Sequence, residues 1–494
     1  MKFQKYFPLV PVLAFMIYYC ISFQFEVYEG GADNYSHYKF AKYSPSYPIL
    51  LLDHWAKPVF TILCLPFAQL GFKGVIFFNV LCGVCAAWMA YLVAKELKHS
   101  YSWVTFFIVL SMPLYYPVMV SCLTEPLFSL ALVVSVYLLL KKKYVAGCIV
   151  ASFLFLIRTE GFVLYPMFTI YLVVMRQYKA IPFLLCGFLL YSTIGYFAYN
   201  DFFWLINKNP YSNTAALYGT GELLHFAKQT KMIFGIPQSI LIVGGIFIAI
   251  YKFISQFVRK TIEADVFLIE GIWTCFFIAH SIVWWLGTGA SLGLIRVMAS
   301  VLPLAAITAG RTINFLDSFI TSYTKIKTYA ITFLAVISLL MPFIMYAIPF
   351  RYTDIDKTKL AFLDWYKQSV YADKKIHLYD PFFYYYLDLD PFDSTRVNEY
   401  IDNKTHPEDE IEPGELYVWD AHFGPNEGGM PIEQIMKNPY FQLVNYFEPS
   451  KPIKVLNDHL YCIYVFERVR RNNLSNDSIL SHFKSSNIKE NLYR

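Results

Sequence analysis

Long apolar runs separated by short polar segments fill the chain from its start to about Pro349. A run of ~20 mostly apolar residues is long enough to cross a bilayer as a helix. On this measure we predict eleven spans, at roughly 7–25, 74–94, 102–119, 125–140, 144–157, 161–175, 181–199, 232–250, 266–286, 292–310 and 328–348. A further run, 59–70, is short and contains Pro66, which favours a re-entrant or interfacial helix.

Positively charged side chains give these spans a predicted orientation. Short cytoplasmic loops of membrane proteins carry an excess of Lys and Arg. With the amino terminus in the cytoplasm, every inner segment is basic: Lys2 and Lys5; Lys95 and Lys98; Lys141, Lys142 and Lys143; Arg176 and Lys179; Lys252, Arg259 and Lys260; Arg311, Lys325 and Lys327. The short outer loops 120–124 and 287–291 carry no basic residue. An odd number of spans then puts the chain after Phe350 outside.

The pattern changes after Phe350 to that of a globular domain. Alternating or continuous apolar runs predict strands at 375–387, 415–420, 441–447 and 460–468, and helices are expected around 358–371 and 432–437. We therefore expect a small extracytoplasmic α/β domain over 351–470. The tail 471–494 is rich in Asn, Ser and Lys, and is predicted to be disordered.

Composition supports a membrane protein and excludes other classes. Hydrophobic residues make up 57% and charged residues 16% of the chain, whereas a soluble domain carries roughly a quarter charged residues. The expected fold is therefore mainly α, a polytopic bundle of about eleven transmembrane helices over 1–350, with outer loops at 26–73 and 200–231. A net charge of +5, spread in short clusters, does not indicate a nucleic-acid partner.

Ionisable residues near membrane depth are costly, so each is a functional candidate. Five places qualify: Asp33; the stretch 53–58, which includes His54 and Lys57; Glu125; Arg158 with Glu160; and Arg296. By the predicted topology all lie at or near outer ends of spans. This clustering predicts a shared site that opens outward.

Most of these residues also have a structural interpretation: Asp33 as the N-cap of a helix over 34–43, Lys57 as a side chain reaching to the interface, Glu125 at a helix start, and Arg158 with Glu160 as a brace between span ends. Arg296 has few structural partners in its apolar surroundings, so a functional interpretation is favoured there. His225 and His280 are interpreted as structural histidines with satisfied hydrogen bonds.

The order of parts over residues 1–350 resembles the GT-C superfamily of polytopic glycosyltransferases. An acid and a Tyr/Ala-rich helix (ADNYSHYKFAKY) follow the first span, and then come HWAKP, SCLTEPLF, RTEGFVLYP, YGTGELLHF and GLIRVMASVLPLAA. The chain is most similar in style to protein O-mannosyltransferases and lipid A aminoarabinose transferases. The succession of these motifs, rather than any one of them, carries the resemblance.

The resemblance implies a role for each candidate. Asp33 falls at the position of the catalytic carboxylate, Lys57 at a lysine that contacts the lipid phosphate, Glu125 near a second acid, and Arg158, Glu160 and Arg296 at recurring charged positions. We expect Arg158 and Arg296 to bind the donor phosphate with Lys57, and His54 and Glu160 to support them. Two departures leave the subfamily and the sugar open: Asn34 stands where many members have Glu, and Val59 where a second Pro is frequent.

The implied activity is transfer of a sugar from a polyprenyl-phosphate donor to an envelope acceptor hydroxyl on protein, lipid or glycan, with inversion. No nucleotide-binding fingerprint is present, which fits a lipid-linked donor. Similar enzymes often need no metal, so no metal or other cofactor is expected. Expected partners are the donor, membrane lipids and the acceptor, and the expected location is the bacterial inner membrane.

Three other functions remain open. A transporter or flippase of lipid-linked sugars would distribute charges along a path to both faces, or show repeated halves with broken helices. A polymerase or ligase would rely on Arg and His in a late outer loop. A non-catalytic scaffold would use its outer domain to bind a partner.

Overall fold

The chain forms two units, which divide between Phe350 and Arg351. The computed structural model describes residues 7–211, 218–259, 264–319, 324–471, 475–481 and 483–484. Lys2, Lys5 and Lys260, which entered the orientation prediction, and the end of the tail from 485 onward lie outside the described residues. The side chains of Arg259 and Lys325 are not described either.

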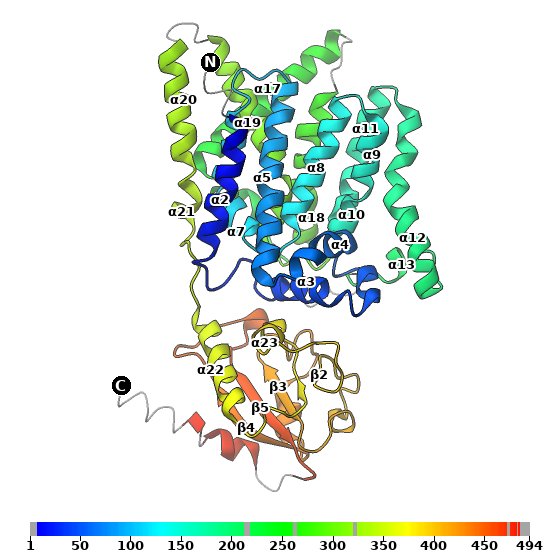
Figure 1. Cartoon of the computed structure of the whole chain (residues 1–494), viewed down its shortest axis with the longest axis vertical. Coiled ribbons are helices and arrows are strands. Elements are labelled where there is room, and N and C mark those ends of the chain that lie inside the picture. The colour runs from blue at the N-terminus through cyan, green and yellow to red at the C-terminus, as the bar shows by residue number, and fades with distance from the viewer. Residues whose placement is uncertain are drawn as a thin grey trace. The chain divides into compact units, whose positions relative to one another are not determined.

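The first unit is a helical bundle (Figure 1). Its elements are η1 (Phe7–Leu9), α2 (Val10–Ser22), α3 (Ala32–Tyr43), η2 (Pro48–Leu52), α4 (Pro58–Ala68), α5 (Phe72–Glu96), α6 (Val104–Ser111), α7 (Tyr115–Met119), α8 (Glu125–Leu140), α9 (Tyr144–Ser152), α10 (Leu154–Ile157), η3 (Thr159–Leu164), α11 (Tyr165–Val174), η4 (Tyr178–Leu185), α12 (Cys186–Tyr199), α13 (Trp204–Asn207), α15 (His225–Lys228), α16 (Thr230–Ile233), α17 (Ile236–Arg259), η5 (Phe267–Gly271), α18 (Ile272–Leu286), η6 (Ile295–Val301), α19 (Leu302–Phe319), α20 (Thr324–Ser338) and α21 (Met341–Met345).

Five helical stretches are long and apolar enough to cross a membrane: Phe72–Glu96, Tyr178–Tyr199, Ile236–Gln256, Phe267–Leu286 and Ile295–Ser318. Shorter apolar helices accompany them at Phe7–Ser22, Pro58–Ala68, Glu125–Leu140, Tyr144–Ile157, Thr159–Val174 and Ile326–Ser338. An integral membrane protein with a mainly helical fold is thus confirmed, whereas the count of eleven crossings stays a prediction.

The predicted span 102–119 is not one continuous helix. It is divided into α6 and α7 at Met112, whose backbone is extended because Pro113 follows it. The predicted span 292–310 is also displaced, since a 3₁₀ segment, η6, precedes α19, which continues to Phe319.

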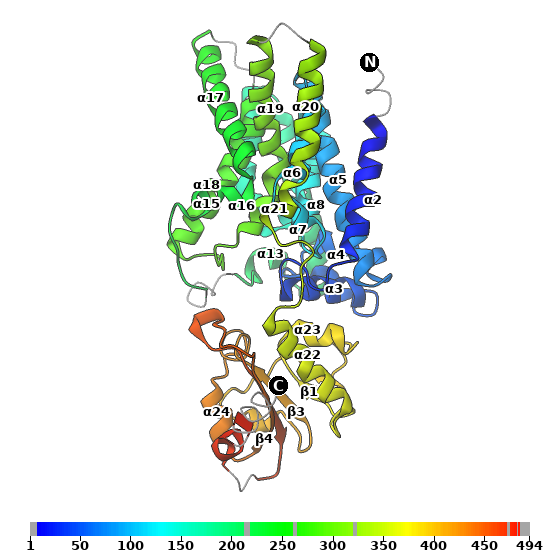
Figure 2. The same cartoon turned by 90° about the vertical axis from the view of Figure 1, so that its left-hand side faces the viewer.

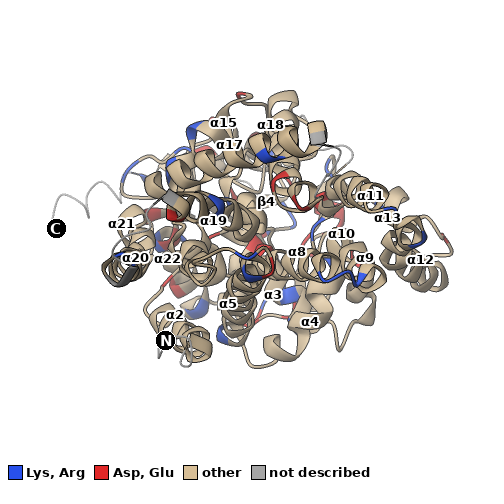
Figure 3. Ribbon diagram, turned by 90° about the horizontal axis from the view of Figure 1, so that it is seen from above, with Lys and Arg blue, Asp and Glu red and all other residues tan. Residues whose placement is uncertain are grey.

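Burial separates central from peripheral helices. In the stretch Ile295–Ser318, which contains α19, 72% of the most apolar window is buried, against 22% for the window in α17. Seen from above, α8 and α19 lie among the other helices (Figure 3). The exposed apolar face of α17 is therefore the one suited to contact lipid.

Helices α3 and α4 pack against each other at the end of the bundle where α5 begins (Figure 1). The chain also leaves the bundle at this end, because the Glu26 amide donates to the carbonyl of Phe350 at 3.1 Å. Lys95 and Lys98 lie at and just beyond the other end of α5. The outer-loop candidates and the inner-loop lysines are thus at opposite ends of one helix.

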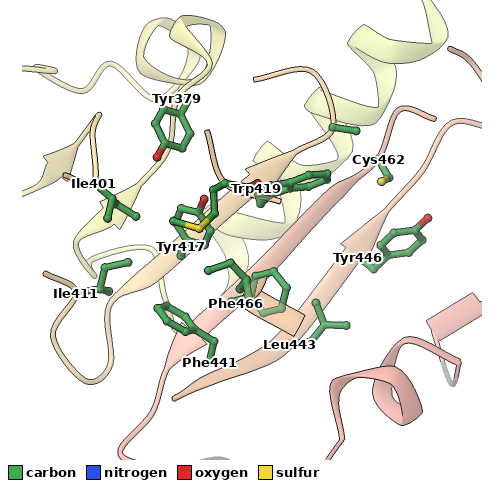
Figure 4. Packing of buried hydrophobic residues seen from close by; sticks show 13 residues of the cluster. Tyr379, Ile401, Ile411, Tyr417, Trp419, Phe441, Leu443, Tyr446, Cys462 and Phe466 are labelled. Atoms are coloured by element: carbon green, nitrogen blue, oxygen red, sulfur yellow. Dashed lines mark hydrogen bonds between the residues drawn. The ribbon is translucent and has the colours of Figure 1, made fainter. Parts of the chain in front are cut away.

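The second unit contains a five-stranded sheet in the order β2-β1-β3-β5-β4. Its strands are β1 (Ile376–His377), β2 (Val397–Asn398), β3 (Leu416–Asp420), β4 (Phe441–Phe447) and β5 (Ile463–Arg468), and its helices are α22 (Asp354–Gln368), α23 (Pro381–Tyr386) and α24 (Ile432–Lys437). β1 is parallel to β2 and β3, and β5 is antiparallel to β3 and β4. Tyr417, Trp419, Phe441 and Phe466 form part of its core (Figure 4).

Two segments of this unit differ from the sequence-based expectation. The apolar run 375–387 forms only the short strand β1 before turning into α23, because Asp380 caps the helix through its Oδ1, which accepts from the Phe382 amide at 2.9 Å. In the predicted disordered tail, 476–481 is helical. Its buried Asn476 accepts from the Leu443 amide at 2.9 Å, which ties it to β4.

Candidate active site

Asp33 lies in the first turn of α3 and pairs with Arg296 of η6. Gly31, with φ of 50°, occupies the N-cap position, so Asp33 is not the cap that its position suggested. Gly30, with φ of 98°, lies so close to the guanidinium that a Cβ there would be 2.8 Å from Arg296 Nη1. The Asp33 side chain is 40% exposed and that of Arg296 12%, so the acid is the accessible member of the pair.

Asn34 fixes α3 to the loop that precedes Glu125. Its Oδ1 accepts from the Cys122 amide at 2.7 Å, and its Nδ2 donates to the carbonyls of Gly31 and Glu29. From α5, Asn79 Nδ2 donates to the carbonyls of Ser121 and Leu123, both at 2.7 Å. Asn34 acts as donor and acceptor at once, which a Glu side chain cannot do in its ionised form. An Asn at this position therefore suits the contacts that it makes here.

Lys57 is a buried cation whose hydrogen bonds to the described residues all go to neutral oxygens. Its Nζ donates to Thr159 Oγ1 at 2.9 Å, to the Tyr211 hydroxyl at 2.6 Å and to the His54 carbonyl at 3.3 Å. The residue precedes α4 in the left-handed conformation, with φ of 65°. Burial lowers the pKa of its ammonium to about 8, which nearby carboxylates, first that of Glu160, oppose. A cation in this setting is stabilised by an anion.

Arg158 is matched by two carboxylates. Its Nη1 lies 2.7 Å from Glu125 Oε1 and its Nη2 lies 2.8 Å from Glu160 Oε1, while Thr124 Oγ1 accepts from Nη1 at 2.9 Å. Glu125 begins α8 and Glu160 lies in η3, so the three side chains join two helix starts. The brace predicted for Arg158 and Glu160 is present, and it extends to Glu125.

His37 is near enough to the charged groups to be affected by their charges, although the sequence did not single it out. It follows Asp33 by one turn of α3, and its ring stacks on Trp55 with centroids 5.0 Å apart. Burial lowers the pKa of this imidazole to about 3, and the charges of Asp33, Lys57, Arg158 and Arg296 all act on it. The structure therefore brings together the acid and the three cations predicted from separate motifs.

Other residues of the site were missed or had a weaker signal. Thr159 and Tyr211 are neutral, and nothing in their sequence context marks them. Glu29 was missed although it belongs to the same polar loop; burial raises the pKa of its carboxyl, which the nearby Arg296 opposes. His54 was a predicted supporting residue, and burial and then Lys57 lower the pKa of its imidazole to about 4.

A second charged network lies toward the other end of the bundle. Arg311 Nε donates to Glu270 Oε1 at 2.7 Å and Nη2 to Asp265 Oδ2 at 2.8 Å, and all three residues are buried. The sequence placed Arg311 in an inner loop, but α19 continues past it, so the guanidinium lies inside the bundle. Lys252 Nζ lies 3.4 Å from Asp265 Oδ2, so two cations face two carboxylates in this network.

Comparison with known proteins gives a likeness of fold. No family model matches the sequence, and no curated protein sequence does so. The structure superposes on that of ArnT from Cupriavidus metallidurans bound to undecaprenyl phosphate, with a TM-score of 0.56 and 11% identity over 94% of this chain and 98% of that one. The fold is similar to that of ArnT.

ArnT is a lipid A aminoarabinose transferase of the GT-C superfamily, so the resemblance predicted from the succession of motifs is confirmed as a likeness of fold. The ArnT-like fold covers 94% of this chain and 98% of that one, so the likeness extends beyond the first unit. At 11% identity it does not assign the role of any residue.

Proposed function

We propose that this protein is a membrane glycosyltransferase that takes its sugar from a polyprenyl-phosphate donor and passes it to an acceptor hydroxyl of the cell envelope. The ArnT-like fold supports the general class, since the ArnT structure contains undecaprenyl phosphate. The observation that carries the proposal is Lys57, a buried ammonium with hydrogen bonds to three neutral oxygens. It stands in the same cluster as the accessible carboxylate of Asp33.

In the proposed reaction, Asp33 accepts the proton of the acceptor hydroxyl as its oxygen attacks the anomeric carbon. The bond from that carbon to the phosphate oxygen breaks on the opposite face, which inverts the configuration. Polyprenyl phosphate leaves with the bonding electron pair. Lys57 and Arg296 neutralise the charge that develops on it, and they do so strongly because the site is largely shielded from water.

The remaining charged residues position these groups. Arg158 already has two carboxylate partners, so we assign it chiefly to holding Glu125 and Glu160 in place rather than to binding the phosphate. Thr159, which stands between Arg158 and Glu160 in the chain, orients Lys57. Glu125, the second-acid candidate, is 1% exposed, so a direct contact with the acceptor is not assigned to it.

The positive-inside pattern supports an extracytoplasmic location for this end of the bundle in a bacterial inner membrane. The described groups of the proposed site gather at one end, and the charges of the Arg311 network are paired with one another. A flippase needs polar groups along a path to both faces, which this arrangement does not favour.

The proposal is tested by comparing envelope glycans of wild-type and deletion strains by mass spectrometry, and by assaying purified protein with glycosylated undecaprenyl phosphates. Loss of one sugar substituent in the deletion strain, restored by the wild-type gene and not by Asp33→Asn, is the expected result. An unchanged glycan profile together with no transfer by the purified protein contradicts the proposal.

A further inference from the structure

Two buried nitrogen atoms on α18 have no hydrogen-bond partner among the described residues. They are His280 Nε2 and Trp284 Nε1. His280 is 8% exposed. The two residues are four positions apart on one helix, so they share a face. We expected His280 and His225 to be structural histidines with satisfied hydrogen bonds. His280 Nε2 has no partner among the described residues, whereas His225 Nε2 lies 2.8 Å from the Gly293 carbonyl.

Aromatic rings and glycines surround these two nitrogens. The His280 ring lies 4.4 Å from that of Phe276 between centroids, and 6.2 Å from that of Phe226 on α15. Figure 2 shows α15 beside α18, and the two helices are in contact. The Trp284 indole packs so closely on Gly221 that a Cβ there would lie 1.9 Å from Nε1. Packing of this kind fixes the indole and leaves its N–H without a protein acceptor.

This face of α18 continues the site around Lys57. Helix α18 packs against η3, which begins at Thr159, the hydrogen-bond partner of Lys57. The charges of Glu160 and Arg158 act on the imidazole of His280. Glu160 is 30% exposed and pairs with Arg158 through Oε1. Lys57 and helix α18, which carries His280, thus both contact η3, the element that carries Glu160.

We propose that Glu160, His280 and Trp284 form the subsite for the sugar ring of the donor, beside the Lys57 site for its phosphate. The inference rests on the proposed function and adds the residues that recognise the sugar. A sugar ring presents several hydroxyls and an apolar face. A carboxylate accepts hydrogen bonds, a neutral imidazole donates and accepts, and an indole N–H donates. A few such groups set among aromatic walls are typical of a site that orients a small polar ligand.

The competing explanation is that ordered water satisfies the two nitrogens.

The experiment measures, by microscale thermophoresis on the full-length protein, the affinity for undecaprenyl phosphate alone and for undecaprenyl phosphates carrying glucose, mannose, galactose or aminoarabinose. The ratio of the affinity for a glycosylated lipid to the affinity for the bare lipid isolates the contribution of the sugar. Variants are His280→Phe and Trp284→Phe, which keep a ring, and Glu160→Gln. The matched control is His99→Phe, since His99 Nδ1 is also buried without a partner but lies beyond the far end of α5.

We expect the wild type to bind at least one glycosylated lipid more tightly than the bare lipid. Each of the three variants should reduce that ratio about tenfold, as the loss of one hydrogen bond does, and the control should leave it unchanged. Affinity for bare undecaprenyl phosphate should stay within about twofold in His280→Phe, Trp284→Phe and the control. If one variant fails to fold, the other two variants still test the proposed sugar subsite.

The proposal is overturned if the wild type binds no glycosylated lipid more tightly than the bare lipid. It is also overturned if the variants keep the wild-type affinity ratio, or if they lower the affinity for the bare lipid as much as the affinity for the glycosylated lipid. Failure of the proposed function has a different signature. In that case the wild type does not bind bare undecaprenyl phosphate and transfers no sugar.

Discussion

The carboxylate of Asp33 pairs with the guanidinium of Arg296, 263 positions further along the chain. The group proposed as the base is thus matched by a cation proposed to bind phosphate. A phosphate dianion competes for that guanidinium, and donor binding would then release the carboxylate for the acceptor hydroxyl. Asp33→Asn removes the base while preserving the shape of the side chain.

We expect Asp33→Asn to lower kcat by roughly 10²–10⁴-fold, because the general base is lost. Abundance and melting temperature should change little, since a 40% exposed carboxylate in an ion pair contributes about 1 kcal/mol or less. The measurement is transfer of radiolabelled sugar by purified protein. Asp53→Asn is the control, because its Oδ1 accepts from the Ala56 amide at 2.8 Å and Asn retains that acceptor. Full activity of Asp33→Asn would remove the base assignment.

Arg296→Ala should affect the donor rather than the acceptor. Loss of a charge-assisted contact costs about 1.5–3 kcal/mol, so we expect kcat/KM for the lipid donor to fall by roughly 10–100-fold. Steady-state kinetics with each substrate varied in turn separates the two effects. An unchanged KM and turnover for the donor would contradict a role for Arg296 at the phosphate.

Lys57 predicts a dependence on pH. Because burial lowers the pKa of its ammonium to about 8, the free protein loses this charge as the pH rises through that value. We expect kcat/KM for the donor, which reports the free enzyme, to fall on the alkaline side with a midpoint near that pKa. Lys57→Arg stays charged and should move the alkaline limb to higher pH, whereas Lys57→Ala should be weak at every pH. If Lys57→Arg shows the alkaline fall in kcat/KM at the same pH as the wild type, the titrating group is not Lys57.

Residue chemistry alone was enough to single out Asp33, Lys57, Glu125, Arg158 and Arg296, because ionisable residues in an apolar chain are few. The pairing of Asp33 with Arg296 could not be predicted, since nothing in one sequence links two segments so far apart. His37 was missed because a histidine in a polar loop looks ordinary until the fold places it near four charges.

The helices show the same limit. The run 74–94 predicted α5 to within two residues at each end, because a long apolar segment has few alternatives. The run 102–119 was equally apolar, but Pro113 breaks it into two short helices. Arg311 was assigned to a loop because its charge ended the apolar window, whereas buried carboxylates allow α19 to continue past it.

Arg311→Met should be strongly destabilising. It leaves the buried carboxylates of Glu270 and Asp265 without their guanidinium partner, which costs about 3–5 kcal/mol. Lys252→Met is the matched control, because Lys252 is 33% exposed and its Nζ lies 3.4 Å from Asp265. We expect a large fall in melting temperature for Arg311→Met and a small one for the control. The affinity for undecaprenyl phosphate should hold below the melting transition. Gly310, next to Arg311, lies against His99 beyond the far end of α5, and the 25 residues of α5 span about 37 Å.

If Arg311→Met melts like the wild type, the network is not needed for stability. A partial recovery on adding Glu270→Gln, which removes one of the orphaned charges, would identify the unpaired carboxylate as the cause of the loss.

We expect the stability of the second unit to fall as the pH rises, whereas a salt-bridged acid makes stability rise with pH. Burial, and then the charge of Asp380, raise the pKa of the Asp420 carboxyl to about 7 from an ordinary 3.8. Between these two values the folded state binds more protons than the unfolded state, so the stability of this unit should fall as the pH rises from about 4 to about 7. Above about pH 7, Asp420 causes no further loss of stability.

Asp420→Asn tests this effect with little change of shape. Asp420 Oδ1 accepts from the amides of His422 at 2.9 Å and Phe423 at 3.0 Å, and the Asn carbonyl can take both hydrogen bonds. Hydrogen exchange over β3 in the full-length protein, corrected for intrinsic rates at pH 5, 6, 7 and 8, should show protection falling with pH in the wild type. The variant should show a much flatter profile and greater protection than the wild type at pH 8. Parallel profiles in the two proteins would mean that Asp420 is already ionised in the folded state at pH 5, held so by the two amides and by Lys359, whose Nζ lies 2.5 Å from Asp380.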